Sequence, residues 1–241
     1  MLTNIIEFSA PKDYVKVKEN LPVPIKTNLP AWFKNLSNTD DDMTIKKCMP
    51  FLQTLTSGYL LKTPIDIEIK HNFKNDQGER RTLFNTRMAQ EAKGNININT
   101  HGHAHSFTQL ENSPFIKKNL DFDIYKILNP WKIKTPKGYS CLCLPPLNNR
   151  DDRFEIFSGI VETDAHEIEI NFPFCVNGDK YPVLNTTIKK GTPYVQIIPF
   201  KRDNWRIKIS ENIDGMQDHF SFLTWAKKFY KEKLWKKTSW R

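Results

Sequence analysis

Apolar and polar residues alternate along much of the middle of this chain. In "PIDIEIK" the isoleucines at every second position fall on one side of an extended backbone, and Asp66, Glu68 and Lys70 fall on the other. A period of two residues is typical of a strand with one buried face. Further short strands are predicted at "NININTHGHAH", "WKIKTP", "YSCLCLP", "FEIFSGIVE", "EIEINFPF", "TTIKKG" and "YVQIIPF". Short alternating strands separated by Pro, Gly and Asn-rich turns predict an antiparallel sandwich or barrel.

The two ends of the chain follow other patterns. Four prolines in the first 43 residues predict an extended arm, with one turn of helix at "PAWFKNL". In "TIKKCMPFLQTLTSG" apolar residues recur at helical spacing, and we expect the regular helix to begin near Met49, because Pro50 fits only in a first turn. Gly58 is a natural stop. The sequence therefore predicts an N-terminal arm and helix (1–57), a β core (58–205) and a helical basic tail (206–241).

The predicted C-terminal helix has an apolar stripe and a basic face. The stripe comprises Phe220, Leu223, Ala226, Phe229, Tyr230 and Leu234. From Ala226 onward there are seven Lys or Arg and one Glu, a net charge of 7 − 1 = +6 out of +9 for the chain. Such a tail can contact nucleic acid or an acidic partner, and it can equally be a solvated helix face.

Composition sets the class of protein. No stretch approaches the roughly 20 apolar residues of a membrane helix, and the N-terminus lacks the pattern of a signal peptide, so we expect a soluble cytoplasmic protein without membrane contact. The spacing of Cys141 and Cys143 is not that of a zinc site, which predicts reduced, buried thiols.

Three segments between Ile133 and Phe200 resemble a known family. "IKTPKGYSCLCLPPLN", "SGIVETDAHEIEINF" and "IKKGTPYVQIIPF" occur in the order and approximate spacing of the second, third and fourth motifs of the dUTPase and dCTP deaminase superfamily. "TSGYLL" resembles the first motif. In that family a strand ends in a phosphate loop, and the next hairpin brings an acid to the same place. The proline break after "YSCLCL" would serve such a loop, whose amides can face a triphosphate.

The resemblance implies a fold and a set of site residues. The expected fold is mainly β, with a dUTPase-like β-clip or jelly-roll core, and family members usually form homotrimers that share sites between subunits. The family's catalytic acids fall on Glu162 and Asp164. The candidate nucleotide-binding residues are Asn148, Arg150, Arg153, Lys190, Gly191 and Gln196. Gly191 and Gln196 match the fourth motif, whereas the basic residues lie close enough in sequence to replace the family's phosphate ligands.

This chain also departs from the family's motifs. The tyrosine after the second acid is Ala165, the arginine and serine of the phosphate loop fall near Pro146 and Leu147, and the first-motif aspartate falls on Leu60. The glutamate that the deaminases need falls near Phe172, and the glycine-rich C-terminal arm has no counterpart. Hydrolysis of a pyrophosphate needs charge stabilisation together with a positioned base. The departures therefore favour a member without catalytic activity.

A row of histidines offers a separate chemistry. His101, His103 and His105 share one face of the predicted strand "NININTHGHAH", where alternate residues lie about 6.5 Å apart. Two imidazoles at that spacing can reach one metal ion. No carboxylate lies close in sequence to complete a ligand shell, and a row of amides and imidazoles is also what an exposed sheet face looks like.

Three functional hypotheses follow. The first is a degenerate, non-catalytic dUTPase-like module that binds a nucleotide or serves in assembly. It agrees with a likeness of the whole chain to an uncharacterised family of bacteria and tailed phages, and a phage-encoded protein would lie in the host cytoplasm or the virion. The second is a divergent nucleoside triphosphate pyrophosphatase that uses Glu162, with Mg²⁺ held mainly by the substrate. The third is a metal-binding β-sandwich protein.

Overall fold

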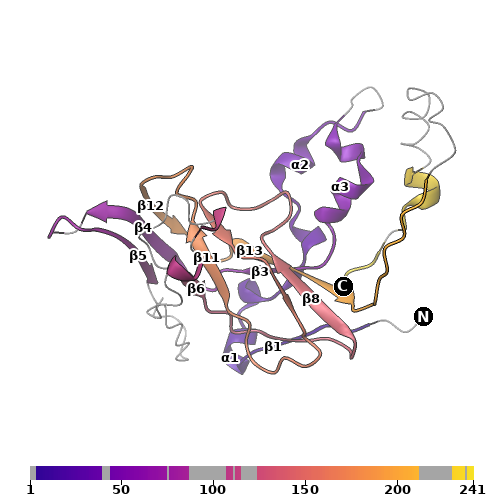
Figure 1. Ribbon diagram of the computed structural model, residues 1–241, viewed down its shortest axis with the longest axis horizontal. Helices are drawn as coiled ribbons and strands as arrows, with labels where there is room; N and C mark the ends of the chain where they lie inside the picture. The colour runs from indigo at the N-terminus through magenta and orange to yellow at the C-terminus, as the bar shows by residue number, and fades with distance from the viewer. Residues whose placement is uncertain are drawn as a thin grey trace.

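The structure is a computed structural model that describes residues 4–39, 44–74, 76–86, 107–110, 112–114, 124–211, 230–236 and 238–241. A five-stranded antiparallel sheet, ordered β10-β8-β13-β3-β2, forms one side of the core (Figure 1). Its strands are β2 (Val23–Pro24), β3 (Tyr59–Lys62), β8 (Tyr139–Leu144), β10 (Gly159–Val161) and β13 (Pro193–Lys201). β13 pairs with β8 along six residues and with β3 on its other side.

Smaller antiparallel sheets complete the β structure. One is ordered β6-β11-β9, from β6 (Tyr125–Ile127), β11 (Phe172–Val176) and β9 (Phe154–Ile156). Another is ordered β12-β4-β5, from β12 (Leu184–Ile188), β4 (Ile67–Lys74) and β5 (Arg80–Thr86). A ribbon pairs β1 (Glu7–Ser9) with β7 (Lys132–Lys134). The prediction of a mainly β, antiparallel core is therefore confirmed.

The sheets share one hydrophobic core. Alternate residues of β13, β8 and β4 point into it, and aromatic side chains of β11 fill its centre, where Phe174 meets Phe154 and Phe84 edge to face. Ile67 and Ile69 are buried, as the alternation predicted. Cys141, Cys143 and Cys175 are buried free thiols, and Cys48 is half-buried, which agrees with the expected reduced state.

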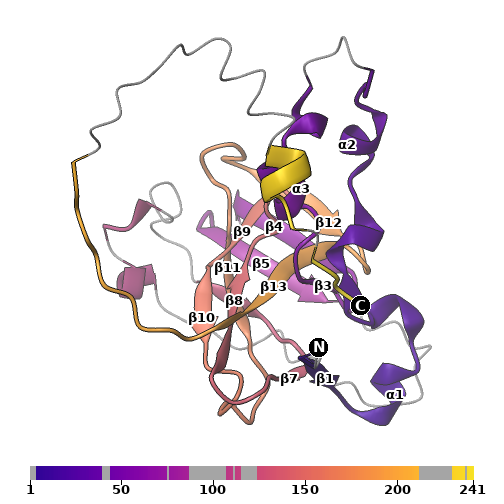
Figure 2. The ribbon, with the colours of Figure 1, turned by 90° about the vertical axis from the view of Figure 1, so that its right-hand side faces the viewer.

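Short helices surround this core. They are α1 (Lys12–Val15), α2 (Ala31–Asn35), α3 (Met49–Thr54), and single 3-10 turns at η1 (Lys18–Asn20), η2 (Ile25–Asn28), η3 (Ile45–Lys47) and η4 (Phe107–Leu110). α2 and α3 form a pair that projects from one end of the β core (Figures 1 and 2). α3 begins at Met49 with Pro50 in its first turn, as predicted.

Gly58 connects α3 to the core at a very close approach. Its φ is +83°, and a Cβ at this position would lie 2.2 Å from the carbonyl oxygen of Ile197. Only glycine adopts this left-handed backbone conformation readily and has no Cβ to collide with that oxygen. α3 itself ends at Thr54, so the predicted stop lies four residues beyond the helix, where the chain passes directly against β13.

Several predictions about the chain ends and strands need correction. "EIEINFPF" is a strand only from Phe172 onward. Residues 206–211 are extended rather than helical, and Tyr230–Leu234 is a short π-helix, η6. Alternating apolar residues at Trp205, Ile207 and Ile209 have the period of a strand, which explains why no helix begins there. The remainder of the predicted stripe and the strand with His101, His103 and His105 lie outside the described residues, and the domain boundaries stay predictions.

Candidate functional site

The loop between β8 and β9, residues 145–153, forms the centre of the candidate site. β8 ends at Leu144 because Pro145 and Pro146 lack the N–H groups that a strand needs. The Asn149 N–H then donates to the Pro146 carbonyl at 3.2 Å and closes a turn. Asn148 has a φ of +55°, a left-handed conformation that asparagine tolerates better than most residues. The proline break predicted from the sequence is thus a tight turn out of the sheet.

Gln196 of β13 fixes the start of this loop. Its side chain is fully buried, and its Oε1 accepts a hydrogen bond from the Leu147 N–H at 2.8 Å. Its Nε2 donates to the carbonyls of Thr54 at 3.1 Å and Ser57 at 2.8 Å. Asn148 Nδ2 adds a bond of 2.8 Å to Thr54 Oγ1. One buried amide therefore joins the loop, the end of α3 and the central sheet.

Arg153 fixes the other end of the loop. Its guanidinium forms a bidentate pair with Asp151, with Nη2 at 2.6 Å from Oδ2 and Nε at 2.9 Å from Oδ1. Its Nη1 donates to Thr186 Oγ1 at 2.9 Å and to the Thr187 carbonyl at 3.2 Å. The Asp151 carboxylate raises the pKa of Arg153. Arg153 is therefore engaged in holding the loop against β12.

A groove of about 620 Å³ lies beside this loop. A smaller hollow of about 380 Å³ shares Asn149 and Arg150 with it and extends to Thr192, next to Gly191. The groove is lined by Trp32, Leu144, Pro145, Pro146, Leu147, Asn148, Asn149, Arg150, Glu155 and Ser158. Two of the predicted nucleotide-binding residues, Asn148 and Arg150, thus line one groove.

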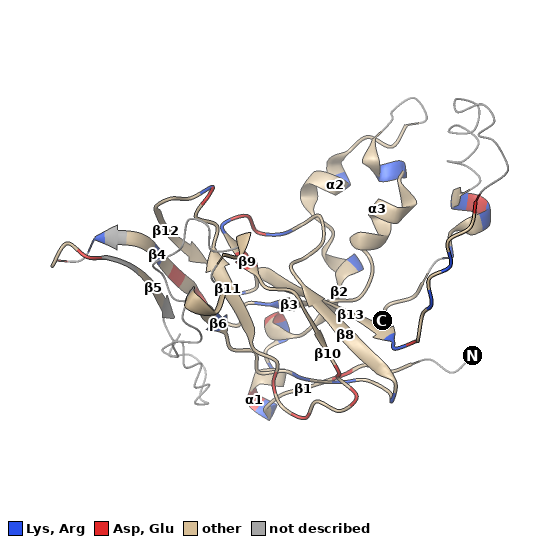
Figure 3. Ribbon diagram, in the orientation of Figure 1, with Lys and Arg blue, Asp and Glu red and all other residues tan. Residues whose placement is uncertain are grey.

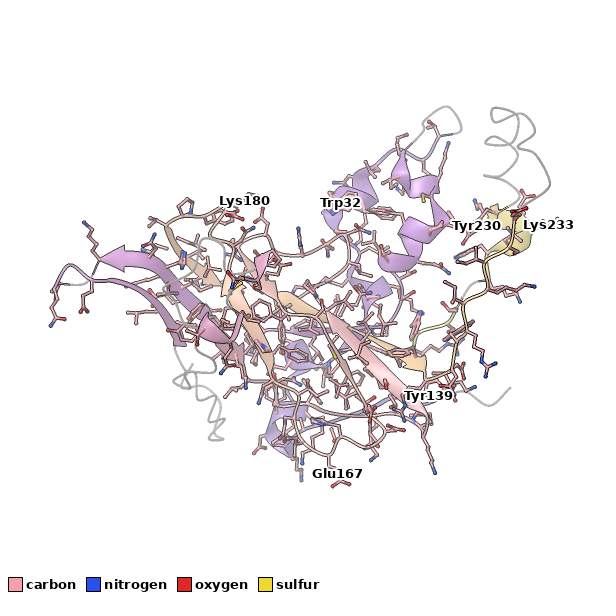
Figure 4. The ribbon with its side chains drawn as sticks, viewed as in Figure 1. Trp32, Tyr139, Glu167, Lys180, Tyr230 and Lys233 are labelled. Carbon is pink, nitrogen blue, oxygen red and sulfur yellow. The ribbon has the colours of Figure 1, made fainter. Side chains whose placement is uncertain are left out.

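Arg150 and Trp32 give this groove its chemistry. The Arg150 side chain is 64% exposed, and its Nη1 lies 3.4 Å from Glu155 Oε1, a loose contact for an ion pair. Trp32 of α2 is 44% exposed and packs edge to face on Phe33 and Phe51. Figure 4 labels the Trp32 side chain beside α2. A guanidinium can bind phosphate oxygens, and an indole face can stack on a base. The groove can therefore hold a molecule that carries both an anion and a flat ring.

The predicted catalytic acids lie at the other end of β8. Glu162 is exposed on the turn that follows β10. Asp164 accepts hydrogen bonds from the Gly138 N–H at 2.8 Å and from Arg202 Nη1 and Nη2 at 2.8 and 2.5 Å. The Arg202 guanidinium holds the pKa of Asp164 well below its usual range. Asp164 is thus a structural anchor for the end of β13.

The strand register shows how far the two acids lie from the groove within one chain. β10 pairs with Cys143 to Cys141 of β8, so its far end and Gly138 lie toward the beginning of β8, whereas the groove lies after Leu144. Six residues of strand span about 20 Å. Figure 4 likewise shows Trp32 well apart from Tyr139, at the start of β8. The structure does not bring Glu162 and Asp164 together with Arg150 in one subunit.

Lys190 and Gly191 belong to the turn between β12 and β13. The Lys190 N–H donates to Asp66 Oδ1 at 2.7 Å, and Lys189 Nζ lies 3.0 Å from Asp66 Oδ2. Both contacts lower the pKa of Asp66, and the hydrogen bond from the Lys190 backbone has the larger effect. Gly191 has a φ of +84°, which the turn requires. In this chain, the match of Gly191 to the fourth motif therefore has a local structural explanation.

Sequence reasoning missed Trp32, Glu155 and Ser158 as groove residues. Trp32 comes from α2, far away in sequence, so only the fold brings it to the groove, whereas Glu155 and Ser158 lie on one segment that directly follows the loop. The described residues contain no group of three or more His, Cys, Asp or Glu side chains that could bind a metal ion. His101, His103 and His105 lie outside the residues covered by that statement. No helix among the described residues is long and apolar enough to cross a membrane.

Solved structures of several proteins are similar to this chain, and three of them have one activity in common. They are phage dUTPases. A dUTPase of Staphylococcus bacteriophage 80alpha, solved with dUpNHpp, is 11% identical over 90% of this chain and 94% of that chain, at a TM-score of 0.35. The dUTPase of phage phi11 of S. aureus, described with a structural Mg(II) ion, is 10% identical over 87% and 99%, also at 0.35.

These enzymes belong to the family whose motifs the sequence resembles. At this identity and TM-score no residue role passes from them to this chain. No family model matches the chain, and no curated protein matches its sequence.

Proposed function

We propose that this protein is a dUTPase-like module that binds a nucleotide in the groove beside the β8–β9 loop and lacks a complete hydrolytic site within one chain. The observation that carries the proposal is that Arg150 and Trp32 line the same groove next to a loop held in place by Gln196. The groove volume of about 620 Å³ lies within the range of small-ligand sites.

The phosphates would bind at Arg150. Its guanidinium presents several donors, and its only described ion pair, with Glu155, is long enough for a phosphate to replace. Asn149 and Ser158 also line the groove and would supply neutral donors. Arg153 and Gln196 serve a different purpose, because their polar atoms already bond to the protein and hold the loop that presents Arg150.

The base would stack on Trp32. Its indole is fixed edge to face against Phe33 and Phe51, so little side-chain entropy is lost when a ring stacks on it. Stacking of a base on an aromatic side chain contributes about 1–3 kcal/mol and discriminates weakly between bases. Selectivity among nucleotides would then depend on the polar groups of the loop.

Hydrolysis is the alternative function, and one observation favours it. Glu162 is exposed and stands outside the Asp164–Arg202 pair, so it can enter the groove of a neighbouring subunit. In a homotrimer such a contact would place Glu162 of one subunit, as a general base, in the same groove as Arg150 of its neighbour. Mg²⁺ would be held mainly by the phosphates of the nucleotide. Glu162→Gln would then abolish pyrophosphate release without lowering the melting temperature.

The test is a thermal-shift and calorimetry panel of dNTPs, dUTP and ribonucleotides, each at about 1 mM with and without Mg²⁺. A ligand at 100 times its dissociation constant stabilises a protein by about 2.7 kcal/mol, which raises the melting temperature of a chain of this size by about 5–10 °C. Arg150→Gln should remove that shift. Lys12→Gln, which removes one positive charge on exposed α1, should keep it. A flat panel with the wild-type protein would overturn the proposal.

A further inference from the structure

The groove beside the β8–β9 loop continues past Arg150 into the smaller hollow. Asn149 and Arg150 line both spaces. α2 borders both as well, because Ala31 lines the hollow and Trp32, the next residue, lines the groove. A nucleotide with its base on Trp32 and its phosphates at Arg150 would leave the hollow, of about 380 Å³, unfilled. The two spaces together therefore suit a ligand that extends beyond its phosphates.

The lining of these two spaces carries little positive charge. Arg150 is the only Lys or Arg among the residues that line either of them. Asp151 lines the hollow and Glu155 lines the groove, and only the Asp151 carboxylate is neutralised from outside the two spaces, by Arg153. The terminal phosphate of a free nucleoside triphosphate would share one guanidinium with the phosphates before it and would face carboxylates in both spaces.

Basic residues are plentiful in other parts of the chain. Figure 3 shows them along the extended segment after β13, where Arg206 and Lys208 lie, and on η6. None of these residues lines the groove or the hollow. Within the described part of the chain, the two spaces therefore suit a ligand of low negative charge better than a polyanion.

Apart from the two charged residues of the loop, the lining of the hollow is neutral. Leu29, Pro30, Ala31 and Pro193 give it apolar walls, with the two prolines at the beginning of α2 and of β13. Asn28 is exposed and adds an amide that both donates and accepts hydrogen bonds. Apolar walls with a few neutral polar groups match a sugar, whose ring carries C–H groups between its hydroxyls.

We infer, on the basis of the nucleotide site proposed above, that the ligand is a nucleoside diphosphate whose terminal phosphate is esterified to a sugar. The base would stack on Trp32, the two phosphates would bind Arg150, and the sugar would occupy the hollow. Esterification removes the second ionisation of the terminal phosphate, which has a pKa of about 6, so such a conjugate carries about two negative charges where a triphosphate carries about four. The sugar hydroxyls would exchange hydrogen bonds with Asn28, and no phosphate would approach Asp151.

Isothermal titration calorimetry measures this preference directly. UDP-glucose is compared with UDP and UTP, and GDP-mannose with GDP and GTP, because stacking on Trp32 discriminates weakly between bases. In at least one series the conjugate should bind at least about tenfold more tightly than either free nucleotide, with or without Mg²⁺. The reason is that the conjugate adds contacts in the hollow and brings less charge to Arg150.

Filling the hollow tests where the sugar lies. Ala31→Phe places a ring in the hollow and should reduce the preference for the conjugate to less than about twofold. Asn28→Ala should reduce it by about fivefold, as expected for one hydrogen bond. Asn35→Phe is the matched control, because Asn35 is exposed on the same helix but lines neither space, and it should keep the full preference. Melting temperatures equal to that of the wild type would show that the variants are folded.

The outcomes separate this inference from the proposed function. If free nucleotides bind and neither conjugate is preferred, the inference is overturned, while the proposed nucleotide site stands. A preference that survives Ala31→Phe would also overturn it, because the sugar would then lie outside the hollow. If neither conjugates nor free nucleotides bind, the proposed function and the inference fail together.

Discussion

Replacing Gln196 with leucine tests whether one buried amide holds the groove loop to the core. Leucine has a similar volume but removes the three hydrogen bonds to the Leu147 N–H and to the carbonyls of Thr54 and Ser57. Each such bond contributes about 1 kcal/mol net, and more where the partner is left buried without another. These partners are only partly buried, so water can replace some of the loss. We therefore expect a loss of about 3 kcal/mol.

Chemical denaturation measures this loss directly as a change in the free energy of unfolding. In thermal unfolding the same loss corresponds to a fall of about 6–12 °C for a chain of this size. Gln53→Leu is the matched control, because it makes the same chemical change in α3 where the described structure records no side-chain hydrogen bond. Nucleotide affinity should fall in Gln196→Leu as the loop loosens. If both variants unfold within about 1 kcal/mol of each other, the role assigned to Gln196 is wrong.

Three further measurements test local features of the fold. Gly58→Ala should destabilise by more than about 2 kcal/mol, since its Cβ would overlap a carbonyl of β13, whereas Gly78→Ala, with a similar φ and open space, should cost only about 1 kcal/mol in the same denaturation assay. Burial lowers the pKa of His71 to about 4, so the folded state is neutral where the unfolded state binds a proton. Stability should then fall as pH drops from about 6.5 toward 4, and a pH series on His71→Leu should lose that slope. The pKa of Asp164 is held low by Arg202, so its contribution is present above about pH 4 and is lost as pH falls further. Asp164→Asn should flatten an acid-denaturation profile below that pH, and an unchanged profile would contradict the assignment.

Residue alternation predicted the β core because each strand has one buried face. The buried isoleucines of β4 and the buried cysteines of β8 obey that period, and Pro50 lies in the first turn of α3, where its missing N–H costs nothing, whereas α3 ends at Thr54, four residues before Gly58. The prediction of a helical tail from residue 206 onward, which rested on the stripe between Phe220 and Leu234, overlooked the same period in "WRIKI". The period of two was present there, and the structure follows it.

The site was less predictable than the fold. Because Glu162 and Arg150 are close in sequence, the motifs predicted that they share one site. In the structure the length of β8, about 20 Å, separates the regions in which they lie. Trp32 joins the groove from α2, more than a hundred residues from the loop it faces. Arg153 and Gln196 were predicted to bind nucleotide, whereas in the structure their polar groups already bond to the protein. Sequence spacing does not show whether a polar side chain faces a ligand or its own backbone.

The anchoring of the β8–β9 loop at both ends has a consequence for how a ligand would be recognised. Gln196 fixes its start and Arg153 fixes its end, so the loop reaches its shape when the chain folds and not when a ligand arrives. Association would then proceed close to a rigid docking event, with little backbone movement and a small loss of conformational entropy. A receptor of this kind discriminates by shape, so that a closely related nucleotide with one misplaced group would be rejected mainly through faster dissociation.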